Sequence, residues 1–209
     1  MSAALDLDKI RPAFAEPVRE SQLAFRRILD AVARPGTRAD FGLATTPPAG
    51  LGVAAATLAL TLFDFETPVW LDPALRGGEV ETWVRFHCGC PLTTDAAQAA
   101  FAIVTDIAAA PPLAAFNLGD AKYPDRSTTL ILQVEGLDGG EAVALSGPGI
   151  RDQAMVAPRG LPADFWGQMQ ENNAKFQFGV DVLLASGGAM IAVPRSSQIH
   201  IPQSQSQGG

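Results

Sequence analysis

Three arginines, Arg85, Arg126 and Arg195, carry the side chains of this sequence that are best suited to binding an anion. A guanidinium group can donate two parallel hydrogen bonds to a phosphate-like group. Ser127 directly follows Arg126 and adds a hydroxyl group to the same candidate anion site. The alternative for each arginine is an ion pair on the surface or at a subunit interface, because most arginines in proteins are solvated.

A glycine-containing turn with the sequence SGPG offers a second candidate anion site. The backbone N–H groups around Gly147 and Gly149 can bind phosphate or phosphonate oxygens, as such turns do elsewhere. The turn lacks the GxxxxGK[ST] pattern of a P-loop. The alternative is a turn that ends a strand and uses glycine because the backbone needs a positive φ.

Asp181 stands between Gly179 and an apolar run, so it is expected at the start of a strand. An acid in that position is more often bound to the backbone or to an arginine than catalytic. His87 is the only internal histidine, and no Ser/His/Asp or Cys/His set can be assembled around it. The sequence therefore predicts no catalytic residue.

His87, Cys88 and Cys90 place three possible metal ligands within four residues. A structural zinc site needs four ligands, and the only other histidine, His200, stands near the C-terminal tail. The alternative is a half-buried histidine with small apolar cysteines after a helix. We therefore predict no metal site.

Length and charge are those of an ordinary globular protein. The chain has 209 residues, of which 47% are hydrophobic, and this is enough for one well-formed core. A net charge of -7 argues against binding to nucleic acid or to an anionic membrane surface. The longest apolar run, residues 51–63, is shorter than the roughly 20 residues needed to cross a bilayer. With two cysteines and no signal-peptide pattern, we expect a cytoplasmic protein.

The clearest predicted helix begins at Ser21 and ends before Pro35 and Gly36, which together stop a helix. Residues 1–20 are polar and are expected to form a leader segment along the surface. Within the helix, apolar residues recur at i, i+3, i+4 and i+7, a spacing that predicts one buried face. The residues of that face are Phe25, Ile28, Leu29 and Val32.

The rest of the sequence alternates between helical and strand patterns. Helices are expected at residues 51–64, 79–87 and 162–175, and strands at 67–71, 99–105, 128–134, 142–147, 180–185 and 189–194. Turns rich in glycine predict a hairpin or meander that joins 128–134 to 142–147, and a hairpin that joins 180–185 to 189–194. The prediction is one layered α/β domain with a mixed sheet over residues 21–201, followed by a disordered tail at 202–209.

Seven blocks of the chain resemble the PhnH family, the H subunit of the carbon-phosphorus lyase core complex of bacterial phosphonate metabolism. They are FRRILDAVARPGT, TPVWL, RFHCGCPL, TTLILQV, LSGPGI, FQFGVDVLL and IAVPR, and they extend from about Gln22 to Arg195. The resemblance departs from the family pattern at Gln177, where proline is expected, and at the two cysteines of HCGC.

The resemblance implies a fold similar to the large domain of pyridoxal-phosphate-dependent transferases, an α/β/α sandwich, but without that cofactor. It implies a homodimer in isolation and, in the cell, assembly with the G, I and J subunits. That complex forms alpha-D-ribose 1-phosphonate 5-triphosphate from ATP and a phosphonate. The family resemblance assigns this subunit a required, non-catalytic role in that step.

The lysines of the sequence agree with the absence of a cofactor. A pyridoxal enzyme needs a lysine for its Schiff base, and this chain has only Lys9, Lys122 and Lys175. Lys122 lies in a polar loop, where a solvated lysine is the better interpretation. The alternative function is a stand-alone enzyme that binds a phosphorylated small molecule through Arg126, Ser127 and the SGPG turn. Because the sequence shows no acid, base and nucleophile set, the subunit function is favoured over the stand-alone enzyme.

Overall fold

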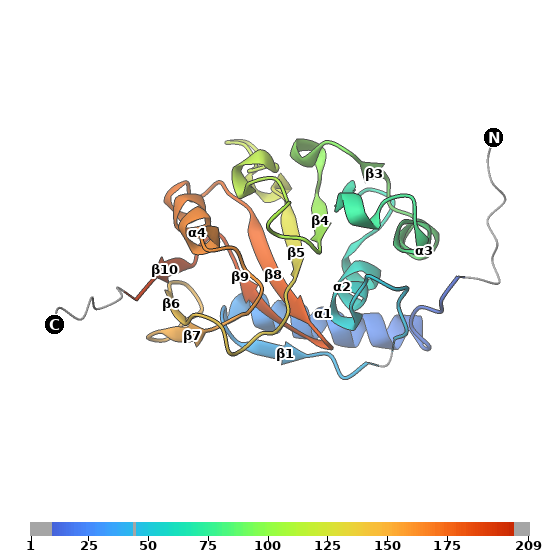
Figure 1. Ribbon diagram of the computed structural model, residues 1–209, viewed down its shortest axis with the longest axis horizontal. Coiled ribbons are helices and arrows are strands. Elements are labelled where there is room, and N and C mark those ends of the chain that lie inside the picture. Colours follow the sequence, from blue (N-terminus) through green and yellow to red (C-terminus); the bar gives the residue numbers. More distant parts are fainter. Residues whose placement is uncertain (1–9, 44, 203–209) are drawn as a thin grey trace.

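A mixed seven-stranded sheet forms the centre of the protein in a computed structural model that describes residues 10–43 and 45–202 (Figure 1). Its strands are β1 (Arg38–Asp40), β2 (Val69–Leu71), β3 (Leu92–Thr93), β4 (Phe101–Val104), β5 (Thr129–Gln133), β8 (Asp181–Ser186) and β9 (Ala189–Val193). They lie in the order β1-β9-β8-β5-β4-β2-β3. Strands β3, β2, β4, β5 and β8 are parallel, whereas β9 and β1 are antiparallel to their neighbours.

Alternating side chains of the sheet divide the interior into two cores, because successive residues of a strand point to opposite faces. In β5, Ile131 packs with one core, and Leu130 and Leu132 pack with the other. The first core is covered by α1 (Pro17–Ala33), α2 (Val53–Leu62) and α3 (Glu79–Cys88). The second is covered by α4 (Phe165–Ala174) and a small sheet. The predicted mixed α/β architecture is therefore confirmed.

The small sheet corrects the predicted pairing of 128–134 with 142–147 as a hairpin or meander. Strands β10 (Gln198–His200), β6 (Val143–Ser146) and β7 (Ala154–Val156) form this separate three-stranded sheet. β6 therefore does not pair with β5, which lies between β8 and β4. The reason is that β5 is apolar on both faces and is therefore buried in the middle of the main sheet. There it forms its backbone hydrogen bonds with β4 and β8. The hairpin of β8 and β9 is confirmed, with Leu183 paired to Ala192.

Several short elements have no clear sequence pattern and were not predicted. β1, β3, β7 and β10 contain only two or three residues each, too few to show a period. His200 lies in β10 and not in an irregular tail. Of the predicted disordered tail, 202–209, residues 203–209 lie outside the described residues.

The first helix begins at Pro17, four residues before the predicted start. Proline suits the first turn of a helix, where its missing N–H group is not needed. Residues 17–20 of the predicted leader are therefore helical. The predicted end is confirmed, since α1 stops at Ala33, just before Pro35 and Gly36.

The buried face of α1 is not the predicted one. Ala24, Ile28 and Ala31 are buried, whereas Phe25 is 45% exposed, and Leu29 and Val32 are exposed as well. Small alanine side chains let α1 lie close to the sheet and α2, so the larger residues are displaced to the side of the helix. Of the four residues predicted to be in the core, only Ile28 is buried.

Replacing Ile28 by Ala should lower the free energy of unfolding by about 2 kcal/mol, because it opens a cavity in the first core. Replacing Phe25 by Ala should lower it by less than about 1 kcal/mol, because that ring is half exposed. Urea denaturation of both variants measures the difference. A larger loss at Phe25 than at Ile28 would contradict this assignment of the buried face.

Candidate functional site

Asp181 and Arg195 form an ion pair at the amino ends of β5 and β8. The Arg195 Nε atom lies 3.2 Å from Asp181 Oδ1, and the backbone N–H of Arg195 donates to the same oxygen at 2.8 Å. Arg195 Nη1 also donates to the carbonyl oxygen of Pro124 at 2.9 Å. Both side chains are largely buried, with exposed fractions of 15% for Arg195 and 27% for Asp181. Arg195 therefore joins the loop before β5 to the strands beside it.

Arg126 and Ser127 lie in this same loop, just after Pro124, whose carbonyl oxygen accepts from Arg195. The Arg126 guanidinium group stacks on the Tyr123 ring at 3.9 Å, and Lys122 Nζ lies 5.0 Å from the centre of that ring. Both cationic side chains are on exposed residues. Ser127 is buried, and its hydroxyl group has no hydrogen-bond partner among the described residues. An anion-binding role for Arg126 and Ser127 stays a prediction.

Arg85 does not lie with the other two arginines. It is in the last turn of α3, which packs on the first core, and its Nε atom donates to Glu81 Oε1 at 3.0 Å. The two residues are one helical turn apart, and the Arg85 side chain is 58% exposed. The structure thus brings Arg126 and Arg195 to one loop region and places Arg85 on a separate element.

The SGPG turn packs against its neighbours on both sides. A Cβ atom on Gly149 would lie 2.1 Å from the carbonyl oxygen of Ala33, at the end of α1. A Cβ atom on Gly147 would lie 2.9 Å from the carbonyl oxygen of Ser196. Both glycines have positive φ, +124° at Gly147 and +82° at Gly149. These close approaches explain why glycine is needed here without any ligand.

Asp72 occupies the opposite end of the sheet, where α/β proteins usually bind ligands, beyond the carboxyl ends of parallel strands. This buried carboxylate follows β2 and accepts hydrogen bonds from the N–H groups of Ala74, Thr105 and Asp106, and from the Thr105 hydroxyl group, at 2.9–3.1 Å. In other proteins, backbone N–H groups at this end of the sheet can bind an anionic ligand. Here they donate to the carboxylate of Asp72.

The electrostatics of Asp72 follow from these contacts. Burial by itself raises the pKa of the carboxyl group, but the hydrogen bonds from Asp106, Ala74 and Thr105 outweigh burial and hold the pKa below its ordinary value. Asp72 is therefore a carboxylate at neutral pH. Sequence reasoning missed this residue, although an acid directly after the apolar strand VWL was a usable signal.

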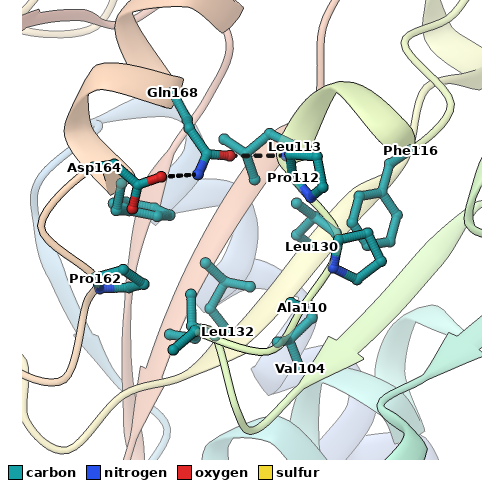
Figure 2. Close-up of a pocket in the computed structure, with 14 residues that line it drawn as sticks. Val104, Ala110, Pro112, Leu113, Phe116, Leu130, Leu132, Pro162, Asp164 and Gln168 are labelled. Carbon is teal, nitrogen blue, oxygen red and sulfur yellow. Dashed lines mark hydrogen bonds between the residues drawn. The ribbon is translucent and has the colours of Figure 1, made fainter.

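Figure 2 shows a cavity of about 270 Å³ between α4 and the loop that follows β4. Its wall is mostly apolar and includes Leu130 and Leu132. Gln168 Nε2 donates to Asp164 Oδ2 at 2.8 Å, and Gln168 Oε1 accepts from the Leu113 N–H at 3.0 Å (Figure 2). Neither lysine nor arginine is among the described residues that line the cavity, so it offers no cationic side chain to a phosphate group.

The histidine and cysteines after α3 make contacts with the chain itself. His87 Nε2 lies 2.9 Å from the carbonyl oxygen of Arg11. Burial raises the pKa of the Cys88 thiol to about 12 and that of Cys90 to about 11. In residues 10–43 and 45–202 no group of three or more histidine, cysteine or acidic side chains is placed to hold a metal ion. None of the helices described there is long and apolar enough to cross a membrane.

These arrangements define a layered α/β protein with a mixed seven-stranded sheet. The family model for bacterial phosphonate metabolism protein (PhnH) matches residues 12–200, nearly the whole chain. The chain belongs to the PhnH family.

Two named relatives agree with this assignment. The chain is 42% identical over 187 residues to the alpha-D-ribose 1-methylphosphonate 5-triphosphate synthase subunit PhnH of Rhizobium meliloti (strain 1021). The aligned region covers 90% of this chain and 94% of the relative. It is 28% identical over 183 residues to a protein of Stutzerimonas stutzeri named as a C-P lyase subunit, HtxG. The aligned region covers 86% of each chain.

Proposed function

We propose that this chain is the H subunit of a carbon-phosphorus lyase core complex and that its role in the complex is to bind partners. In this role it is required for forming alpha-D-ribose 1-phosphonate 5-triphosphate from ATP and a phosphonate, and it does not itself carry out the chemistry. The 42% identity to a subunit of the corresponding synthase is the observation that carries the proposal.

The side chains support a binding role over a catalytic one. Arg195 is bound to Asp181 and to Pro124, and it lies at the amino ends of the parallel strands, away from the usual ligand end. At the carboxyl ends of the strands, where ligands usually bind, the N–H groups that a phosphate would need already donate to the Asp72 carboxylate.

The finer parts of the proposal are a homodimer in isolation, assembly with G, I and J subunits, and a location in the cytoplasm. A fold related to the large domain of pyridoxal-phosphate-dependent transferases also belongs to it, supported by the parallel strands with helices on both faces. The two lysines that the structure describes, Lys122 and Lys175, are exposed, so they suit the absence of the cofactor.

Co-expression with candidate G, I and J subunits tests the proposal. If the chain is a subunit, it will co-purify with them, and light scattering after size exclusion will give a mass well above that of two chains. Omitting one candidate at a time identifies the direct partner. Elution of the chain only with itself would contradict the proposal, and phosphorylated ligands would then be screened against Arg126 and Ser127.

A further inference from the structure

The cavity between α4 and the loop after β4 lies beside the carboxyl ends of β4 and β5, where α/β proteins usually bind ligands. Val104, the last residue of β4, and Leu132, near the end of β5, are part of its wall. Its volume of about 270 Å³ is slightly below the roughly 300–1,000 Å³ of pockets that hold drug-sized ligands. A ligand about the size of a single nucleobase suits this volume.

Rings and prolines give the cavity rigid walls. Figure 2 shows Pro112 and Phe116 on one side of the cavity and Pro162 on the other. Proline has a fixed φ, and the Phe116 ring is held edge-to-face by Trp70, with the ring centres 5.6 Å apart. Phe165 is buried and also lines the cavity. Such walls favour a flat ligand, because aromatic rings and bases stack on flat apolar surfaces.

Two polar side chains at the start of α4 provide directional contacts. Gln168 is held in one orientation, because its Oε1 atom accepts from the Leu113 N–H and its Nε2 atom donates to Asp164 Oδ2. The other carboxylate oxygen, Asp164 Oδ1, accepts no hydrogen bond from the described residues, and the second hydrogen of Gln168 Nε2 has no acceptor among them. A hydrogen-bond acceptor and a hydrogen-bond donor therefore lie side by side at the cavity wall.

This pair of side chains matches the amino edge of adenine. The exocyclic amino group of adenine is a donor, the adjacent ring nitrogen is an acceptor, and side-chain amides read these two positions together. Asp164 can accept from the amino group while the Gln168 amide donates to the ring nitrogen. A carboxylate repels phosphate, and the described lining residues include neither lysine nor arginine to offset that repulsion. The ligand that fits is therefore a base without a phosphate group.

We propose that this cavity binds free adenine. The inference rests on the proposed function and names the small molecule that the subunit binds. ATP consists of adenine joined to ribose 5-triphosphate, and the product of the complex keeps the ribose and the triphosphate but carries the phosphonate in place of adenine. Adenine is therefore the group that leaves. A cavity that accepts the base and rejects phosphate distinguishes adenine from ATP and from the ribose product, which both carry a triphosphate.

Isothermal titration calorimetry of the purified full chain with adenine tests the proposal. Adenine should bind at least about tenfold more tightly than hypoxanthine, in which a carbonyl oxygen replaces the amino group and faces the Asp164 carboxylate. Adenine should also bind more tightly than ATP. Tighter binding of ATP, or no adenine binding at millimolar concentrations, would overturn the proposal. Equal binding of butylamine would overturn it too, because the carboxylate alone would then set the affinity.

Three variants locate the site. Asp164→Asn should weaken adenine binding about tenfold or more, because the charged acceptor is lost. Ala110→Trp should abolish binding by filling the cavity, since Ala110 lies in its wall away from the polar pair (Figure 2). Asp138→Asn is the matched control, because the Asp138 side chain is 82% exposed and Asp138 is not a lining residue of the cavity. It should bind adenine as the wild type does.

Thermal melting of each variant shows whether it is folded. If Ala110→Trp does not fold, Asp164→Asn decides alone, because Asp164 is exposed and its substitution leaves the core unchanged. An adenine affinity that is unchanged in Asp164→Asn would place the base elsewhere and contradict the assignment.

Co-expression separates this inference from the proposed function. A chain that co-purifies with the G, I and J subunits but binds no adenine would refute the inference and leave the proposed function intact. A chain that binds adenine but elutes only with itself would contradict the proposed function, while the assignment of the cavity stands.

Discussion

Replacing Asp72 by Asn is expected to lower the free energy of unfolding by about 3 kcal/mol near neutral pH, because hydrogen bonds to a charged group contribute about 1.5–3 kcal/mol each. The carboxylate accepts from three backbone N–H groups and one hydroxyl group. An asparagine in its place keeps one oxygen but turns an N–H group towards donors on Ala74 or on Thr105 and Asp106. At least one buried donor then loses its acceptor.

The effect of this substitution should depend on pH. The hydrogen bonds hold the folded-state pKa of Asp72 below its ordinary value. The stabilisation is therefore complete above the unfolded-state pKa of about 3.9, and it is lost as the pH falls through the lower folded-state pKa. The difference between wild type and Asp72→Asn should shrink in that acidic range.

Urea denaturation near neutral pH and again below about pH 4 measures both parts of this prediction. Asp138→Asn is the control, because the Asp138 side chain is 82% exposed and should change stability by less than about 0.5 kcal/mol. Equal stability of the Asp72→Asn and Asp138→Asn variants would show that the contacts of Asp72 contribute nothing.

Replacing Arg195 by Met should cost about 3 kcal/mol, because it leaves the Asp181 carboxylate in a mostly buried position without its cationic partner. The carbonyl oxygen of Pro124 also loses its donor. The loop that carries Arg126 is joined to β8 through this arginine, so the loop's amide hydrogens should exchange faster in the variant. Urea denaturation and hydrogen exchange measure these two effects.

A double-mutant cycle separates the ion pair from simple loss of packing. If the pair is coupled, Arg195→Met together with Asp181→Leu should cost less than the sum of the two single substitutions. Arg34→Met serves as the control, because Arg34 pairs with Asp30 in an exposed position and should matter little. Additive costs at Arg195 and Asp181 would rule out the coupling.

Much of the fold could be predicted from local patterns. α2 is apolar around its whole circumference and is buried, and α3 buries Val80, Trp83 and Val84 as its period indicates. The β8–β9 hairpin follows from two apolar runs joined by Gly187 and Gly188. The candidate site was harder. Arginines can be found in a sequence, but the atoms that bind them cannot, and Arg195 meets Pro124 from across 71 positions of the chain.

The sequence by itself determined the type of most helices and strands, the mixed α/β class and the end of α1 at the proline and glycine. These depend on residues close together in the chain, where periodicity and backbone preference act directly. Only the tertiary structure decided that β5 pairs with β4 and β8, that Asp72 binds Thr105, and that α1 buries Ala24 while exposing Phe25. Each of these depends on which distant segment packs against a given face, and a local pattern of apolar residues does not specify that segment.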